Sequence, residues 1–385
     1  LDRGAKKVYG MRHGIQGLLN EDYIDLSEHI QTDLDVELLK RTPAAYLGSC
    51  RYKLPEIHED IATYDKIFSI LDKLEIECFI YIGGNDSMDT IKKLSDYAIL
   101  TGQSQKFVGV PKTIDNDLAL TDHTPGYGSA AKYIATSTKE VIRDGLGFSY
   151  KKQQVIIIEI MGRNAGWLTG AAALSRGEDC DGPDLIYLPE VDFDMEQFLA
   201  DVHRIYEEKN NVLIAVSEGI HYADGSFVSE AKASATDGFG HAQLGGLAAR
   251  LAQVIKEHEH AKVRGIELSL LQRAGAHLAS QTDIDEAFAA GKMAVEAALS
   301  GETGKMVAFE RVMAGGQYAC RMKLIPLSDV ANYEKKVPVE WIVPEGNNVT
   351  QDFIDYALPL IQGVPEIPLE NGLPRYARLK KVLTE

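Results

Sequence analysis

Short apolar runs alternate along this chain with longer segments whose apolar residues recur at helical spacing. The runs predict strands, and they occupy residues 79–82, 107–110, 155–160 and 212–216. The segments with helical spacing occupy residues 57–74, 88–100, 128–143, 195–208, 244–256 and 284–299. We expect Asp283 to cap the last of these helices. The alternation of strand and helix predicts an α/β fold with doubly wound parallel sheets.

Each predicted strand ends in glycine, charged or polar residues. The four ends carry GGNDS at 83–87, PKTIDND at 111–117, MGR at 161–163 and SEG at 217–219. Ligands of open parallel sheets bind beyond the carboxyl ends of the strands, so the four loops predict one shared ligand site. Ordinary polar turns are the alternative. Two Asp residues in one loop and an Arg directly after an apolar strand exceed what a turn requires.

Composition and charge narrow the class of ligand. The chain has 40 Lys and Arg against 57 Asp and Glu, a formal net charge of −17. We do not expect so acidic a chain to bind nucleic acid or an anionic membrane surface. No apolar run approaches the roughly 18 residues of a membrane span. The four cysteines are scattered without a CxxC motif, which predicts reduced thiols and a cytoplasmic protein. An anionic ligand would therefore need a local basic pocket.

Two of the strand-end loops suit phosphoryl transfer. The glycine pair of GGNDS allows close approach of a phosphate to the next helix, and Asp86 suits a phosphate that carries Mg²⁺. Lys112, Asp115 and Asp117 could supply a charge clamp, a general base and an orienting acid. The structural alternatives are a glycine turn with an Asp cap for the first loop and an Asx-turn for the second.

Further residues could recognise a phosphorylated sugar. Arg163 follows an apolar strand, where a phosphate or a developing negative charge is its natural partner. Glu218 could accept hydrogen bonds from sugar hydroxyls. Arg264 and Arg273 flank the apolar stretch 265–271 and could pair with a second phosphate. Ion pairs at the edge of the core or on the surface are the competing explanation for these charges.

In their order and spacing, these motifs resemble those of the 6-phosphofructokinase family. The similarity extends from about residue 14 to about residue 340 and includes GSCR at 48–51, MGRNAG at 161–166 and the pair Gln272-Arg273. The resemblance implies two doubly wound parallel-sheet domains with the active site in the cleft between them. A donor-binding domain would comprise residues 1–126 plus 272–345, and a fructose-6-phosphate domain residues 127–271. Residues 346–385 would pack on the first domain, and the family's first strand with its glycine-rich donor loop would precede Leu1.

The resemblance also addresses the identity of the phosphoryl donor. ATP-dependent members have Gly where this chain has Asp86 and Lys112, so both positions favour the pyrophosphate-dependent form of the family. A carboxylate at 86 would repel a nucleotide phosphate, and a lysine at 112 could neutralise a pyrophosphate leaving group. An ATP-dependent enzyme is the alternative. A non-catalytic sugar-phosphate sensor is a third possibility, because Asn85 and Leu270 depart from the family pattern.

The resemblance implies a role for each matching residue. Asp115 would take the proton from the 1-hydroxyl of fructose 6-phosphate, assisted by Thr113 and Asp117. Lys112 would stabilise the transition state. Contacts to the moving phosphoryl group would come from Arg51 and Arg163. The sugar phosphate would be bound by Thr113, Ile114, Asp115, Met161, Gly162, Arg163, Glu218, Arg264 and Arg273. Pyrophosphate would be bound by Gly83, Gly84, Asp86, Ser87 and Arg51. Mg²⁺ would be bound by Asp86 or Asn85, and the enzyme would be a homodimer or homotetramer.

Overall fold

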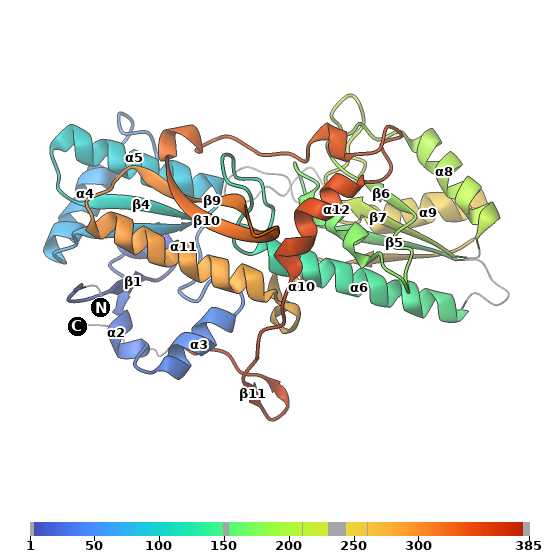
Figure 1. The fold of residues 1–385 in the computed structure, drawn as a ribbon. Helices are drawn as coiled ribbons and strands as arrows, with labels where there is room; N and C mark the ends of the chain where they lie inside the picture. The colour runs from blue at the N-terminus through green and yellow to red at the C-terminus, as the bar shows by residue number, and fades with distance from the viewer. Residues whose placement is uncertain (1–3, 149–153, 210, 230–243, 260, 380–385) are drawn as a thin grey trace.

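Two four-stranded sheets lie end to end in the computed structural model, each with helices packed on it (Figure 1). The structure describes residues 4–148, 154–209, 211–229, 244–259 and 261–379. Ahead of the first sheet lie β1 (Tyr9–Met11), α1 (Gly14–Leu19), β2 (Tyr23–Asp25), α2 (Leu26–His29) and α3 (Asp33–Arg41). In these described ranges, no helix is long and apolar enough to cross a membrane.

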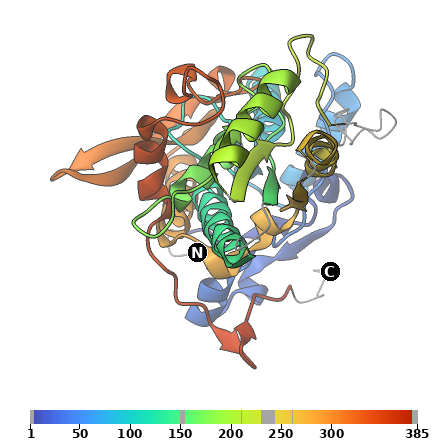
Figure 2. The ribbon, with the colours of Figure 1, turned by 90° about the vertical axis from the view of Figure 1, so that its right-hand side faces the viewer.

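The first sheet has the strand order β10-β9-β4-β3. Its strands are β3 (Cys78–Gly83), β4 (Lys106–Pro111), β9 (Lys305–Ala314) and β10 (Gln317–Pro326). The first three run parallel, whereas β10 returns antiparallel to β9 in a hairpin that extends from the body of the molecule (Figure 2). The core on one face includes residues of α4 (Ile61–Lys73) and α5 (Asn85–Thr101), and the core on the other includes α11 (Gln281–Leu299).

The second sheet is wholly parallel, with the order β6-β7-β5-β8. Its strands are β5 (Gln154–Ile160), β6 (Leu185–Tyr187), β7 (Asn211–Ser217) and β8 (Lys262–Glu267). Every residue of β5 is buried, as expected for a parallel strand with helices on both faces. The covering helices are α6 (Tyr127–Phe148) and α7 (Trp167–Gly170) in one core, and α8 (Met195–Glu208) and α9 (Leu247–Glu259) in the other.

The predicted α/β class and the four predicted strands are confirmed, but two details were wrong. Antiparallel β10 makes the first sheet mixed rather than purely parallel. Asp283 does not cap α11: the side chain of Ser280 accepts the cap hydrogen bond from the Asp283 N–H. The Asp283 carboxylate instead accepts hydrogen bonds from Gly126 N at 2.8 Å and Ser129 N at 3.1 Å. It therefore anchors the start of α6, a contact between segments far apart in sequence.

The C-terminal segment contacts the second sheet as well as residues of the predicted first domain, where Arg311 Nη2 donates to Tyr356 O at 2.8 Å. Phe353 and Ala357 of α12 (Gln351–Ala357) and Leu360 of the following 3₁₀-helix (Leu358–Ile361) lie in the core of the second sheet. The Phe353 ring stacks on Trp167 with centroids 6.1 Å apart, because these apolar side chains find their buried surface on α7. Farther along the chain, the tail contacts the residue that follows α3: Ala377 N donates to Thr42 Oγ1 at 2.8 Å. The remaining short elements are α10 (Leu271–Ala274), β11 (Leu369–Glu370) and β12 (Leu373–Pro374).

Candidate active site

A cleft of about 2320 Å³ opens where the strand ends of the two sheets face each other. It also continues between α3 and α11. Most of the residues predicted for the site line this cleft: Arg51, Gly84, Asn85, Asp86, Lys112, Thr113, Ile114, Asp115, Asp117, Met161, Gly162, Arg163, Glu218 and Arg273. The structure therefore brings the four strand-end loops to one cavity, because the carboxyl ends of β3 and β4 in the first sheet face those of β5 and β7 in the second.

Three predicted residues do not line the described part of the cleft. Arg264 is exposed on β8, the edge strand of the second sheet. Gly83 and Ser87 shape the turn behind the cleft instead. A Cβ on Gly83 would lie 2.1 Å from Ser87 Oγ, so only glycine permits this turn. The carbonyl of Gly83 accepts a hydrogen bond from Lys112 N at 2.9 Å, which ties the GGNDS loop to the neighbouring loop.

Asn85 is occupied by backbone contacts at the start of α5. Its Oδ1 accepts a hydrogen bond from Asn332 N at 2.6 Å, and its Nδ2 donates to Tyr333 O at 3.1 Å. An amide oxygen that already accepts a backbone N–H is a poor candidate for a metal ligand. Of the two residues predicted to face Mg²⁺, Asp86 is therefore the better candidate.

The loop that carries the predicted base is held by its own side chains and by the segment that follows it. Thr113 Oγ1 donates to Asp115 Oδ2 at 3.0 Å and accepts from Asp115 N at 3.1 Å. Thr124 Oγ1 donates to Thr113 O at 2.7 Å. Asn116 is buried in the left-handed region, with φ 58°, and its Nδ2 donates to Tyr356 Oη at 2.9 Å. These contacts fix the direction in which Asp115 enters the cleft.

The two carboxylates of this loop hold their protons more tightly than usual. The cleft walls desolvate Asp115 and raise its pKa, although Thr113, Lys112 and Arg163 act in the opposite direction. Desolvation, with the negative charge of Asp115 as the next cause, raises the pKa of Asp117 to about 7. Two such carboxylates titrate as a coupled pair. A raised pKa makes the Asp115 carboxylate a stronger proton acceptor than an ordinary aspartate, which suits a general base.

The second sheet supplies the opposite wall. Gly162 has φ 148°, and Ser217 Oγ donates to its carbonyl at 2.5 Å, so the loops after β5 and β7 abut. Gly162 N donates to Glu218 Oε1 at 3.5 Å, and burial raises the pKa of Glu218. Buried Gln272 accepts from Met161 N at 3.1 Å and lines the cleft. We did not predict Gln272 as a site residue, although its place beside Arg273 was a usable signal.

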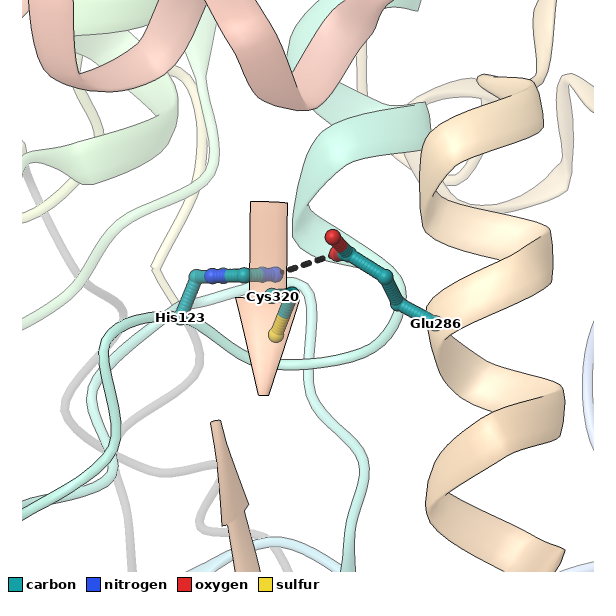
Figure 3. Close-up of side chains that lie close together, drawn as sticks. All are labelled: His123, Glu286 and Cys320. Carbon is teal, nitrogen blue, oxygen red and sulfur yellow. Dashed lines mark hydrogen bonds and ion pairs between the residues drawn. The ribbon is translucent and has the colours of Figure 1, made fainter. Parts of the chain in front are cut away.

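A buried ion cluster lies directly behind the base loop, and no sequence pattern had singled it out. It comprises Asp122, His123, Glu286, Arg311 and Tyr318. The His123 ring lies 2.6 Å from Glu286 Oε2 (Figure 3). Its other nitrogen lies 2.8 Å from Asp122 Oδ2. Arg311 Nε lies 3.1 Å from Asp122 Oδ1, and Tyr318 Oη donates to Glu286 Oε1 at 2.8 Å. The cluster joins the base loop to α11 and to β9 and β10.

The same cluster contains the chemistry of a metal site. The side-chain ligand atoms of His123, Glu286 and Cys320 lie within 4.8 Å of one another (Figure 3). However, each ring nitrogen of His123 already contacts a carboxylate oxygen, an arrangement that favours a protonated imidazole. Burial opposes that charge, but Asp122 and Glu286 outweigh it and raise the pKa of His123. The geometry therefore favours an ion pair over a bound metal.

The fold and the cleft are those of a known class of phosphotransferase. The phosphofructokinase family model matches residues 1–298, and the chain belongs to the phosphofructokinase family. A Halomonas elongata protein named pyrophosphate–fructose 6-phosphate 1-phosphotransferase is 43% identical over 97% of this chain and 88% of its own length. The solved structure of a pyrophosphate-dependent phosphofructokinase from Marinobacter aquaeolei matches with a TM-score of 0.87 at 38% identity, covering all of this chain and 90% of that one.

A relative with a different named substrate is also similar. A sulfofructose kinase from Alkalicoccus urumqiensis is 32% identical over 84% of this chain and 81% of its own length. Relatives of this chain therefore differ in their named substrate, so the choice of substrate depends on the residues of the cleft.

Proposed function

We propose that this enzyme transfers a phosphoryl group from pyrophosphate to the 1-hydroxyl of fructose 6-phosphate, giving fructose 1,6-bisphosphate and phosphate. The reaction is a reversible step of glycolysis. The observation that carries the proposal is that Asp86 and Lys112 line the same cleft as the base loop. Both replace the glycines of ATP-dependent members of the family. A carboxylate and a lysine beside the donor favour a small, highly charged donor over a nucleotide.

In the proposed reaction, the sugar 1-hydroxyl attacks the terminal phosphorus of pyrophosphate. Asp115 accepts the hydroxyl proton, the new P–O bond forms, and the bond to the bridging oxygen breaks to release phosphate. The hydrogen bond from Thr113 Oγ1 orients the accepting carboxylate. Lys112, Arg163 and Arg51 line the same cleft and would stabilise the negative charge that develops on the bridging oxygen as it leaves with the phosphate.

The acidic residues of the cleft fit Mg²⁺. The carboxylates of Asp86, Asp115 and Asp117 line it together, and desolvation raises the pKa of the last two, so a bound cation would stabilise their ionised forms. Magnesium prefers such oxygen ligands and, when bound, would neutralise pyrophosphate oxygens. Asp86 would hold it from the first turn of α5.

The second sheet would bind the sugar phosphate. Met161, Gly162 and Glu218 form the wall that faces the base loop, and Arg273 lies in the cleft for the 6-phosphate. Arg264 is exposed outside the cleft of its own chain, so we propose that it serves the cleft of a second copy in a homodimer or homotetramer. The free thiols of Cys50, Cys78, Cys180 and Cys320 support a cytoplasmic location.

The donor is tested with a coupled assay on the enzyme with pyrophosphate or ATP. We expect turnover with pyrophosphate, and turnover with ATP alone would reject the donor assignment. Lys112→Gly should lower kcat by about 100-fold, because a fixed charge at the leaving group is lost, while sugar-phosphate affinity measured by calorimetry changes little. An unchanged kcat would contradict the role of Lys112. Sugar-phosphate binding without turnover by the parent enzyme would favour the non-catalytic alternative.

A further inference from the structure

Residues 332–337, here called the crossing segment, run over the base of the cleft after β10. The N-terminal end of the segment is hydrogen-bonded to the N-terminus of α5. Asn332 N donates to Asn85 Oδ1 at 2.6 Å, and Tyr333 O accepts from Asn85 Nδ2 at 3.1 Å. Asn332 Nδ2 adds a contact of 3.3 Å to Asp89 Oδ1. Asn85 thus binds the segment through both atoms of its amide, as a backbone strand partner would.

The middle of the crossing segment is hydrogen-bonded to the base loop. Lys335 N donates to Asp117 O at 2.7 Å, beside an antiparallel bridge between Leu118 and Glu334. Lys335 Nζ donates to Asp122 O at 2.7 Å and to Thr121 O at 3.1 Å. The bonds go to carbonyl oxygens, and burial lowers the pKa of the Lys335 ammonium to about 7. Lys335 therefore holds the two ends of the stretch 117–122 together through hydrogen bonds to their backbone carbonyls.

The far end of the segment reaches the second sheet. Asn164 Nδ2 donates to Glu334 Oε1 at 2.9 Å, from the loop after β5. The Trp167 indole donates to Lys335 O at 2.9 Å, and Lys335 Nζ lies 5.1 Å from the Trp167 ring centroid. Val337 N donates to Glu190 Oε1 at 2.9 Å, the same oxygen that accepts from Gly166 N. Six consecutive residues therefore contact all three loops that carry the proposed donor, base and sugar sites.

We propose that the crossing segment is a positioning element that sets the distance between the donor loop, the base loop and the second sheet, with Asn85 and Lys335 as its anchors. The inference rests on the proposed function for its kinetic consequences. It assigns Asn85 to the segment rather than to the metal. Loss of either anchor frees the base loop relative to the donor, and a small misplacement of reacting groups lowers kcat far more than it lowers binding.

The two anchors predict distinct effects. Lys335→Met should lower kcat on the order of 100-fold while KM for fructose 6-phosphate stays within about threefold. Asn85→Ala should lower kcat about tenfold and leave the Mg²⁺ concentration for half-maximal activity unchanged. Asp86→Asn should raise that Mg²⁺ concentration, because it removes the proposed ligand. A shift in the Mg²⁺ requirement on changing Asn85 would overturn its assignment to the segment.

A second measurement tests the segment without substrate or metal. Hydrogen–deuterium exchange should become about tenfold faster at residues 113–122 in Lys335→Met and Asn85→Ala, corresponding to about 1.4 kcal/mol. The matched controls Lys323→Met, on the edge strand β10, and Asn20→Ala, exposed directly after α1, should leave both exchange and kcat unchanged. Circular dichroism shows whether each variant is folded. If Lys335→Met does not fold, the exchange measured on Asn85→Ala decides whether the segment holds the base loop.

The outcomes separate this inference from the proposed function. If the parent enzyme does not use pyrophosphate, the proposed function fails, while the exchange measurement still decides whether the segment holds the base loop. If exchange at residues 113–122 is unchanged in folded variants of both anchors, the positioning role is rejected even when the enzyme is active with pyrophosphate.

Discussion

Asp117 and Asp122 lie five positions apart in one loop, yet their surroundings act on them in opposite directions. Desolvation and the charge of Asp115 raise the pKa of Asp117 to about 7. Burial also opposes ionisation of Asp122, but hydrogen bonds from His123 and Arg311 outweigh it and lower the pKa to about 2. The loop thus has an open end, residues 115–117, whose carboxylates face the cleft, and a paired end, residues 122–123, whose charges form buried ion pairs. A site that binds cationic and phosphorylated ligands needs the first, and a fixed loop needs the second.

The largest effect on activity is expected when a negative charge is removed at the open end of the loop. Asp115→Asn keeps the shape of the side chain but cannot accept the hydroxyl proton, so kcat should fall by about a thousandfold. Calorimetry should show fructose 6-phosphate binding close to that of the parent enzyme. Retention of more than about a tenth of kcat would exclude Asp115 as the base.

Breaking the paired end should affect stability rather than chemistry. His123→Gln leaves Asp122 and Glu286 buried without their shared cation, so the free energy of unfolding should fall by about 3–5 kcal/mol. Urea denaturation followed by fluorescence measures this change. The exposed His203, which pairs with Glu259 on the surface, is a matched control, and His203→Gln should leave the urea midpoint nearly unchanged.

The pH dependence of that loss has a definite sign. The pKa of His123 is raised in the folded protein, so its contribution is complete below the unfolded value near 6.5 and disappears as pH rises through the folded value. The stability difference between parent and His123→Gln should therefore be larger at about pH 6 than at about pH 9. Equal differences at both pH values would mean that the imidazole is not charged in the cluster.

The open end was largely predictable from sequence, and the paired end was not. Apolar β-branched strands followed directly by GGNDS, PKTIDND, MGR and SEG mark sheet edges, so the cleft residues could be named from local patterns. The paired end depends on partners such as Glu286 and Arg311, which lie 163 and 189 positions from His123 and Asp122 respectively. Local spacing carries no information about such pairings.

The same limit explains the errors. Asp283 had the sequence position of a helix cap, but its carboxylate is used by α6 across the molecule. Asn85 lies in a motif that suggested a metal ligand, but its amide is hydrogen-bonded to the backbone of residues 332–333. The C-terminal segment was predicted to pack on the first domain, and the stacking of Phe353 on Trp167 shows that it also packs on the second sheet. In each case a contact between residues far apart in sequence decided the outcome, and local spacing carries no information about it.

The smallest predicted effect sharpens the contrast within the open end itself. The negative charge of Asp115 helps to raise the pKa of Asp117, and because interactions between charges are mutual, an ionised Asp117 also makes the Asp115 carboxyl hold its proton. In Asp117→Asn that charge is gone, so the acid limb of the kcat profile should move to lower pH. Glu334→Gln, which removes a more distant charge acting on Asp117, should shift the same limb in the same direction by less. An acid limb that does not move in Asp117→Asn would show that the two carboxylates titrate independently, and the raised pKa of Asp117 would then have no part in setting the pH at which Asp115 can act as a base.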